Sequence, residues 1–331
     1  MKSVRLYSPG DMRLQEEPLP IPGENQKLIR VKAVGICGSD LHWFAEAGIG
    51  ATRLERPLVL GHELAGETEA GQRVAVDPAI PCRKCEFCQR GHPNLCPEVV
   101  FAGFGDQDGG LREWITWDEK LLFPLPDFLT ITDGLMLEPL GVALHATDLA
   151  KLKAGMTVGV FGCGPIGLLA LQLSRLMGAT RIIATDALPH RVEAAKHFGA
   201  HHAFLAENGA EVEPILAASG GRGVDVAFEF AGEQGAVDTA IATVVPGGKV
   251  VLGGIPAGDK TSFSASVARR KGLTFLLVRR MKHSYPRALD LAIKGLVDVR
   301  SLVTHHFPFS QASEAFRFAA RREGLKTIIE I

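Results

Sequence analysis

The stretch that most constrains this 331-residue sequence is a glycine-rich loop at residues 162–167, G-C-G-P-I-G. An apolar run comes before the loop, a helix is expected after it, and Asp186 ends the next apolar run. This context distinguishes a dinucleotide-binding turn from three structural glycines. Gly162 permits the tight turn, Gly164 lets a pyrophosphate approach the backbone, and Gly167 lets the helix pack closely on the sheet. The sequence therefore predicts a nucleotide whose pyrophosphate lies at a helix N-terminus.

Asp186 also indicates which nucleotide binds. Its carboxylate is placed to accept hydrogen bonds from the adenosine ribose, and its charge would repel a 2′-phosphate, so NAD is expected rather than NADP. Arg191, in the next predicted helix, suits stacking near the adenine as well as phosphate binding, and both roles stay open. The predicted cofactor-binding residues are Gly162, Gly164, Pro165, Ile166, Gly167, Asp186 and Arg191.

Around this loop, apolar strand-like runs alternate with helical stretches from residue 155 to about residue 278. Such alternation implies an α/β fold with a parallel, doubly wound sheet. The expected strands lie at 157–161, 181–186, 224–229, 249–252 and 273–278, with helices at 168–177 and 191–198.

The rest of the chain indicates a second, mostly-β domain. Short strands and turns are expected before residue 133, and no sustained 3.6-residue period occurs there. A helix carrying Glu138 is expected to bridge the domains. The tail is expected to pack back on the first domain as helices near 286–296 and 311–321, the second capped by Ser310, and a strand at 326–329. We therefore expect residues 1–146 plus 281–331 to form one domain and residues 147–280 the other.

Four of the six cysteines, with C-x2-C-x2-C-x7-C spacing, fall in a lobe at residues 81–97. Four thiolates satisfy a tetrahedral Zn²⁺ completely, as in closed structural sites. Unrelated free thiols are one alternative; a nucleic-acid-binding zinc ribbon is another, disfavoured because the flanks are not strongly basic. The pattern is typical of a reducing compartment, so we expect a cytoplasmic protein. The predicted structural zinc ligands are Cys82, Cys85, Cys88 and Cys96.

Composition argues against several classes of partner. The formal net charge is −1, and 46% of residues are hydrophobic and 22% charged. This balance gives no electrostatic case for binding nucleic acid or an anionic membrane. No apolar run reaches the roughly 18–20 residues of a membrane span, and no secretory signal is expected at the N-terminus. We expect a small-molecule ligand, and neither nucleic acid nor membrane.

A second metal site is predicted from residues on separate segments. Cys37 and His62 offer a thiolate and an imidazole, and one carboxylate, Glu63 or Glu138, would complete a three-ligand catalytic zinc site that keeps a position open. The sequence does not decide between the two carboxylates. Asp40 is expected to accept the ring N–H of the ligand histidine. Singly, each residue also suits an ordinary core thiol, core imidazole or ion pair, and the combination favours the metal.

These residues suggest hydride-transfer chemistry. Zn²⁺ would lower the pKa of an alcohol, and the nicotinamide would accept hydride from carbon. Ser39 is expected to hydrogen-bond the alcohol oxygen, and His42 to take the proton away, because the histidine side chain as a type titrates at about 6.5. The alternative for His42 is a surface histidine.

On these motifs, the sequence resembles the zinc-dependent medium-chain dehydrogenases/reductases, and most closely their sorbitol (polyol) dehydrogenase branch. The resemblance covers essentially the whole chain. Its motifs are residues 35–42, 61–63, the four-cysteine lobe, residues 137–140 and the loop 162–167. It implies a GroES-like catalytic domain with a zinc lobe, a Rossmann NAD domain, a homotetramer (or dimer), and a carboxylate in place of the cysteine that alcohol dehydrogenases use as third ligand.

The resemblance further implies oxidation of a secondary alcohol carbon of a polyol or sugar-like substrate to a ketone by NAD⁺. Arg280 corresponds to an arginine that contacts substrate hydroxyls. Trp43 and Met281 stand where polyol dehydrogenases usually carry tyrosines, so we expect Trp43 and Phe104 to give the substrate an apolar wall. The alternatives are an L-threonine, sugar or simple alcohol dehydrogenase of the same superfamily, and a catalytically silent NAD- and zinc-binding protein.

Overall fold

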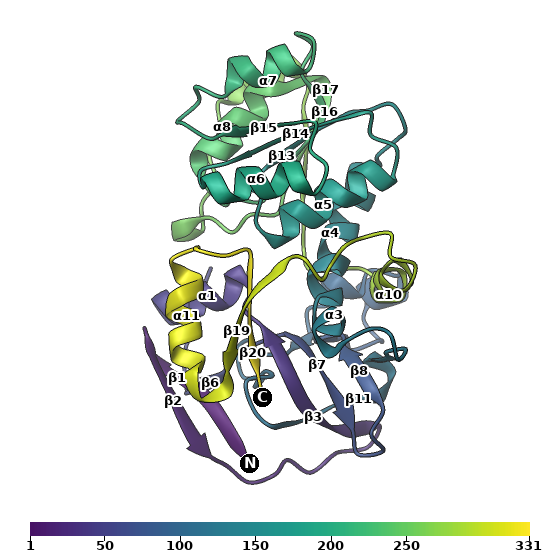
Figure 1. The fold of residues 1–331 in the computed structure, drawn as a ribbon, viewed down its shortest axis with the longest axis vertical. Helices are drawn as coiled ribbons and strands as arrows, with labels where there is room; N and C mark the ends of the chain where they lie inside the picture. The colour runs from purple at the N-terminus through teal and green to yellow at the C-terminus, as the bar shows by residue number, and fades with distance from the viewer. The chain divides into compact units, whose positions relative to one another are not determined.

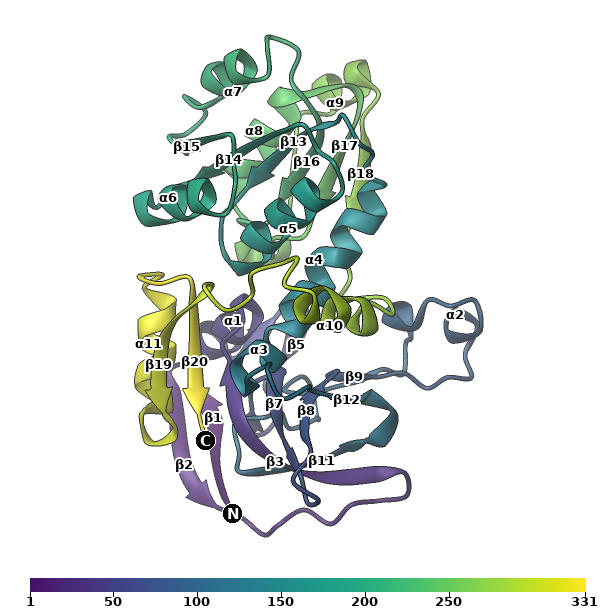
Figure 2. The ribbon, with the colours of Figure 1, turned by 45° about the vertical axis from the view of Figure 1, so that its right-hand side comes forward.

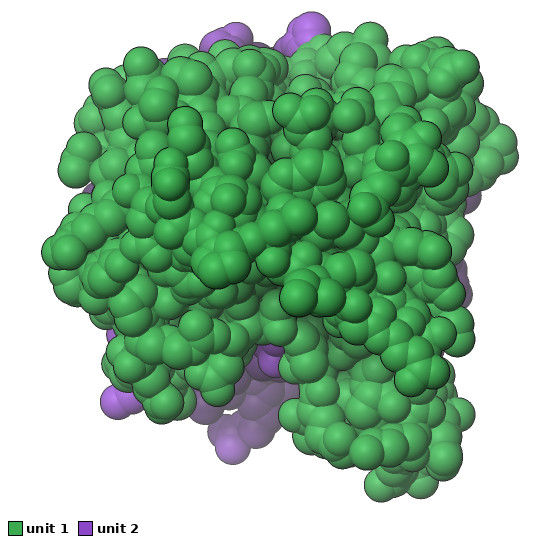
Figure 3. Space-filling model, turned by 90° about the horizontal axis from the view of Figure 1, so that it is seen from below, with its two compact units in different colours: residues 1–139, 282–331 green, residues 140–281 purple.

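The computed structural model describes residues 1–331, which divide into two compact units. Unit 1 comprises Met1–Pro139 and Lys282–Ile331, and unit 2 comprises Leu140–Met281 (Figure 3). The first boundary lies at 139/140, seven residues before the expected 146/147. The second lies at 281/282, one residue after the expected 280/281. The tail belongs to unit 1.

Unit 2 is built on a six-stranded sheet in which every neighbouring pair is parallel, in the order β15-β14-β13-β16-β17-β18. The predicted doubly wound α/β fold is therefore confirmed. Its strands are β13 (Thr157–Phe161), β14 (Arg181–Asp186), β15 (His202–Leu205), β16 (Val224–Glu229), β17 (Val244–Leu252) and β18 (Thr274–Leu277). Its helices are α5 (Pro165–Leu176), α6 (Pro189–His197), α7 (Val212–Ala218), α8 (Gln234–Thr243) and α9 (Ala265–Lys271), with the short turn η3 (Ala257–Asp259).

The central strands of unit 2 are apolar because both faces of the sheet are covered. Helices α5 and α6 pack together, as do α7 and α8, on either side of it (Figures 1 and 2). The strand order reverses between β13 and β16, and the glycine loop follows β13 there. Ligands of open α/β sheets bind at such a switch point, beyond the carboxyl ends of the strands.

Unit 1 is organised around a mostly antiparallel seven-stranded sheet, in the order β12-β8-β7-β3-β20-β19, with β11 also paired to β3. Smaller sheets pair β2-β1-β6, β10-β9 and β4-β5. The strands are β1 (Lys2–Ser8), β2 (Asp11–Glu16), β3 (Gln26–Gly35), β4 (Gly48–Ile49), β5 (Thr52–Arg53), β6 (Leu58–Val59), β7 (Glu63–Thr68), β8 (Arg73–Val76), β9 (Ala79–Ile80), β10 (Val100–Phe101), β11 (Trp114–Asp118), β12 (Leu122–Pro124), β19 (Val303–Pro308) and β20 (Lys326–Glu330).

Helices and short turns complete unit 1, and α2 projects with the cysteine lobe away from the sheet (Figure 2). Helix α4 starts in unit 1 and continues into unit 2, with its proline in the first turn, where a missing N–H costs nothing. None of the helices combines the length and apolarity needed to cross a bilayer. The helices and short turns that begin in unit 1 are α1 (Gly38–Glu46), α2 (Glu86–Gln89), η1 (Pro93–Leu95), η2 (Glu119–Leu121), α3 (Ile131–Leu135), α4 (Leu137–Ala150), α10 (Tyr285–Ile293), η4 (Phe309–Gln311) and α11 (Ala312–Ala320).

Two details differ from the sequence-based expectations. Helix α1 lies before residue 133, where none was expected. It is nine residues long and buries Asp40 beside Trp43 and Phe44, so its inward face is not purely apolar and its period is hidden. Ser310 does not cap α11, because it lies inside η4 and Gln311 occupies the N-cap.

Candidate active site

The thiol, imidazole and carboxylate proposed as metal ligands come together at the ends of two paired strands. Cys37 is the N-cap of α1, just after β3, and His62 precedes Glu63, the first residue of β7. The register of β3 and β7 sets Gly35 opposite Glu63. As a result, one ligand atom from each of Cys37, His62 and Glu63 lies within 4.8 Å of the other two. This S, N, O set fits a tetrahedral Zn²⁺ with one open position.

The orientation of His62 is fixed by Asp40. The carboxylate lies 3.3 Å from Nδ1 of His62, and it also accepts the backbone N–H groups of Cys37 (3.0 Å) and Gly61 (3.3 Å). The other ring nitrogen, Nε2, is 3.5 Å from Ser39 Oγ. A carboxylate on one ring nitrogen sets the tautomer and leaves the other nitrogen for a metal. Burial lowers the pKa of His62, but the anions of Asp40 and Cys37 outweigh it and raise that pKa well above its usual value.

Glu63 has a buried partner that sequence reasoning missed. Its carboxylate pairs with the ammonium of Lys326, and both side chains are almost fully buried. Burial lowers the pKa of Lys326, but Glu63 and Cys37 raise it above the ordinary lysine value, so the group is an ammonium. The sequence signal was a lone lysine at the start of the apolar run K-T-I-I. A charge in such a strand needs a buried partner.

Glu138, the second candidate carboxylate, behaves differently. It is buried in the first turn of α4 and is not among the three groups whose ligand atoms cluster. Burial raises the pKa of Glu138 to about 8; Glu63 and Asp77 raise it further, while His62 and Lys326 oppose the shift.

The predicted proton-transfer and substrate residues of unit 1 lie on α1 and on the segment after β10. Ser39 and His42 share α1, and His42 Nδ1 is 3.5 Å from Glu46 Oε1. Trp43 is fully buried, and its ring meets that of the half-buried Phe104 edge-on at 5.8 Å. Phe104 therefore presents the accessible surface and Trp43 supports it from behind.

Arg280, the remaining predicted substrate residue, is the second-last residue of unit 2, and its backbone is left-handed with φ 55°. For a residue with a long side chain, this conformation is uncommon and marks a position worth testing for function.

The four lobe cysteines also cluster, with their sulfur atoms within 4.8 Å of one another. Backbone N–H groups of Cys82 and Cys85 point at sulfur atoms of Cys96 and Cys82, at 3.4 and 3.3 Å. Such N–H···S contacts favour thiolates. Hydrogen bonding from the Lys84 backbone lowers the pKa of Cys82 to about 7, whereas burial raises the pKa of Cys88 to about 12. This donor set fits a closed Zn²⁺ site.

The glycine loop of unit 2 has the geometry expected of a phosphate-binding turn. Gly162 is left-handed (φ 98°), and a Cβ on Gly167 would collide with the carbonyl of Gly162. Gly164 is the N-cap of α5 without a side-chain cap, and Pro165 occupies the first turn. The amides at this helix start are thus oriented for an anion.

Asp186 lies at the end of β14, but its carboxylate already has two partners. It accepts the backbone N–H groups of Cys163 (2.7 Å) and Leu188 (2.9 Å), and so ties the glycine loop to the β14–α6 turn. Arg191 lies close to the loop, with its guanidinium 3.7 Å from where a Cβ on Gly164 would sit. Asp186 keeps free lone pairs for a ribose, since each carboxylate oxygen accepts more than one hydrogen bond.

Comparison with known proteins agrees with this geometry. Residues 165–294 match the zinc-binding dehydrogenase family, and residues 23–127 match the alcohol dehydrogenase GroES-like domain. Sorbitol dehydrogenase of Bacillus subtilis is 35% identical over 341 residues, covering 99% of this chain and 97% of that protein. The chain belongs to the zinc-dependent medium-chain dehydrogenases. The probable D-xylulose reductase A of Arthroderma otae is 37% identical over 334 residues, covering 96% and 94% of the two chains.

Solved structures of the same family superpose over the whole chain. An Escherichia coli oxidoreductase/dehydrogenase of unknown specificity gives a TM-score of 0.94 at 31% identity, covering 100% of this chain and 99% of that one. Galactitol-1-phosphate dehydrogenase from Escherichia coli gives a TM-score of 0.90 at 27% identity, covering 100% of both chains. The predicted family and two-part fold are therefore confirmed, as is the predicted class of enzyme, a zinc- and NAD-dependent alcohol or polyol dehydrogenase.

Proposed function

We propose that this enzyme oxidises a secondary alcohol carbon of a polyol or sugar-like substrate to a ketone, with NAD⁺ as hydride acceptor. The observation that carries the proposal is the buried cluster of Cys37, His62 and Glu63 beside Ser39. It is supported by whole-length similarity to a sorbitol dehydrogenase and a probable D-xylulose reductase, whose named substrates are polyols or their ketoses.

In this proposal Cys37, His62 and Glu63 hold the catalytic zinc, which acts as a Lewis acid on the alcohol when bound. Clustering favours Glu63 over Glu138 as the direct ligand. Asp40 holds His62 in the ligand tautomer. Glu138, whose pKa is raised by burial, lies outside this ligand cluster.

The proton leaves along α1. Ser39 hydrogen-bonds the alcohol oxygen, and His42 takes the proton at a ring nitrogen. Glu46 Oε1 lies 3.5 Å from Nδ1 of His42, and its side chain is 57% exposed, so it connects the imidazole to solvent. The four lobe cysteines hold a second, structural zinc.

Substrate preference is assigned to three side chains. Arg280, through the five donors of its guanidinium, suits neighbouring hydroxyl groups, while Phe104, supported by Trp43, faces the C–H side of the substrate. The arginine favours a substrate with oxygen on neighbouring carbons over a simple alcohol, and the names of the relatives favour a polyol over L-threonine.

For the cofactor, Asp186 favours NAD over NADP, because its charge opposes a 2′-phosphate. The glycine loop residues Gly162, Gly164, Pro165, Ile166 and Gly167 form the pyrophosphate cradle. Arg191 is assigned to the adenine side of the same site.

We also infer a homo-oligomer, a tetramer or a dimer, in the cytoplasm. Strand β18 forms an edge of the unit 2 sheet, and Leu277 on it is 74% exposed, with Ile255 and Val267 also exposed. An open edge with apolar side chains is suited to pairing with a second copy. Six free cysteines fit a reducing compartment. Analytical ultracentrifugation of wild type and Leu277→Glu tests the assembly; a monomeric wild type would contradict it.

A substrate panel tests the proposed reaction. Polyols, sugars, L-threonine and simple secondary alcohols are each offered with NAD⁺, and NADH formation is followed by absorbance. We expect polyols to give the highest kcat/KM. Arg280→Ala should raise KM for a polyol about 10-fold or more while changing a simple secondary alcohol little, because a buried substrate hydroxyl left unpaired costs about 1–3 kcal/mol. Equal effects on both substrates, or preference for L-threonine, would reject the polyol assignment.

A further inference from the structure

Lys326 is a fully buried lysine at the candidate metal site to which no role has yet been assigned. Only 2% of its surface is exposed. Its ammonium pairs with Glu63 and donates a hydrogen bond to the carbonyl of Ile36 at 3.0 Å. Lysine is almost never buried to this extent unless its charge is paired, because an isolated buried ammonium is very costly.

The sheet of unit 1 explains how a residue so near the C-terminus reaches the metal ligands. Strand β3 lies between β7 and β20, and its last residue, Gly35, is opposite Glu63 on one side and paired with β20 on the other. The backbone N–H of Ile36 donates to the carbonyl of Thr327, next to Lys326. Strand register therefore brings the lysine to Ile36, 290 residues earlier in the sequence, and beside the glutamate.

Glu63 is held from two directions. Its Oε2 faces the ammonium of Lys326, and the same oxygen occupies the space that a Cβ on residue 35 would need, which glycine leaves open. A carboxylate paired through one oxygen keeps the other available for a metal ion. The pair also places a positive charge beside the anionic donors Cys37 and Glu63.

We propose that Lys326 is a positioning residue for the catalytic metal: it holds the Glu63 carboxylate turned toward Cys37 and His62. The inference rests on the proposed function, in which Glu63 is a zinc ligand. The partner of a ligating carboxylate is part of the metal site, and its loss typically weakens metal binding by about 10–100-fold. The competing role is a structural tie between β20 and the end of β3, which would alter stability without acting through Glu63.

The test measures zinc affinity of the catalytic site by chelator competition in the full-length protein, with the cysteine lobe kept loaded. The variants are Lys326→Met, Glu63→Gln and the double variant. We expect Lys326→Met to weaken zinc binding about 10–100-fold and the double variant to bind no more weakly than Glu63→Gln alone. Lys326→Arg should retain most of the affinity.

A matched control is Lys271→Met in unit 2. The Lys271 ammonium binds three backbone carbonyls at 2.6–2.9 Å, far from any proposed ligand in sequence, so its loss should lower stability and leave zinc affinity unchanged. The melting temperature of the proteins with only the lobe zinc bound reports folding. If Lys326→Met does not fold, Lys326→Gln, which keeps an N–H donor for Ile36, replaces it.

Each outcome either supports or overturns the role proposed for Lys326. If Glu63→Gln weakens zinc binding and Lys326→Met does not, the inference is overturned while the proposed function stands. Additive losses in the double variant also overturn it, because Lys326 would then act by a route other than Glu63. Unchanged zinc affinity in Glu63→Gln rejects the proposed ligand set and the inference with it.

Discussion

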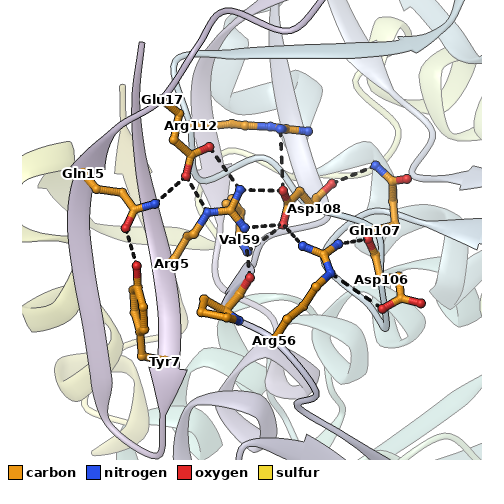
Figure 4. A network of polar contacts seen from close by, with 11 residues as sticks. Arg5, Tyr7, Gln15, Glu17, Arg56, Val59, Asp106, Gln107, Asp108 and Arg112 are labelled. Atoms are coloured by element: carbon orange, nitrogen blue, oxygen red, sulfur yellow. Dashed lines mark hydrogen bonds and ion pairs between the residues drawn. The ribbon is translucent and has the colours of Figure 1, made fainter.

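Arg5 and Asp108, 103 residues apart in the sequence, are joined by two hydrogen bonds of 2.9 and 2.7 Å between guanidinium and carboxylate (Figure 4). Glu17 pairs with the same guanidinium, and the backbone N–H of Val59 donates to Asp108 at 3.1 Å. The segment after Asp108 then bonds to residues 59–61, directly before His62. This network therefore ties the first strand of unit 1 to the backbone that leads into the metal site.

Replacing Asp108 with Asn tests that tie. A bidentate, partly buried ion pair is worth more than a surface one, so we expect a loss of about 1–3 kcal/mol in the free energy of unfolding, read from urea denaturation. Asp106→Asn is the control, since its side chain is 86% exposed and it should change stability little. Equal stability of Asp108→Asn and wild type would show that the network is not stabilising.

Glu17 gives the same network a pH dependence. Hydrogen bonding from Arg5 lowers the pKa of Glu17 from 4.5 to about 2. Because the folded pKa is depressed, the stabilisation is fully present above about pH 4.5 and is lost as pH falls from there to about 2. We expect the stability difference between wild type and Glu17→Gln, measured by denaturant titration at several pH values, to shrink across that window. A difference that stays constant between pH 7 and pH 3 would rule this out.

Much of unit 2 was predictable because its signals are local. Apolar runs, a glycine loop and a terminal Asp186 lie within 30 residues, and β13, α5 and β14 appear where they were expected. Helix α1 was missed because its buried face includes the polar Asp40, and the sheet edge strand β15 is too short to give a clear pattern.

What the sequence could not provide was pairing between distant segments. Lys326 reaches Glu63 only through the β7-β3-β20 order, and Arg5 reaches Asp108 only because β1 lies beside that loop. The choice between Glu63 and Glu138, left open by their identical chemistry, likewise depends on strand register. The clustering of Glu63 with Cys37 and His62 favours Glu63 over Glu138 as the proposed direct metal ligand.

Two zinc ions per chain with separable roles are the next prediction. Cys37→Ala should lose one zinc and nearly all activity with an intact fold, whereas Cys88→Ala should mainly lower the melting temperature, because a structural site contributes folding energy. Mass spectrometry measures the zinc content of each variant, and thermal melts measure its melting temperature. One zinc per chain in fully loaded wild type would contradict the assignment.

Gly35 should be intolerant of any side chain. A Cβ there would meet the Glu63 carboxylate at a distance that real structures do not show, so Gly35→Ala must displace Glu63. We expect loss of catalytic zinc with the lobe zinc retained. Gly38→Ala is the control, because a Cβ at Gly38 meets nothing within 4 Å. Full zinc content in Gly35→Ala would mean that the carboxylate has room to move and still bind.

Cofactor preference is assigned to Asp186 in the proposed site, but its two backbone hydrogen bonds complicate the usual exchange for a small residue. Asp186→Ser would remove the charge and also release the Cys163 and Leu188 amides, so lower affinity for both cofactors would follow from a disturbed loop. Asp186→Asn removes the charge while keeping an acceptor oxygen, and isolates the electrostatic effect. We expect kcat/KM for NAD⁺ to fall about 10-fold and the ratio of NADP⁺ to NAD⁺ use to rise, since a lost hydrogen bond to the ribose costs about 1–3 kcal/mol. Arg191→Gln, measured alongside, should leave the ratio unchanged if Arg191 lies against the adenine. A ratio that falls in Arg191→Gln and does not move in Asp186→Asn would instead assign cofactor choice to the arginine.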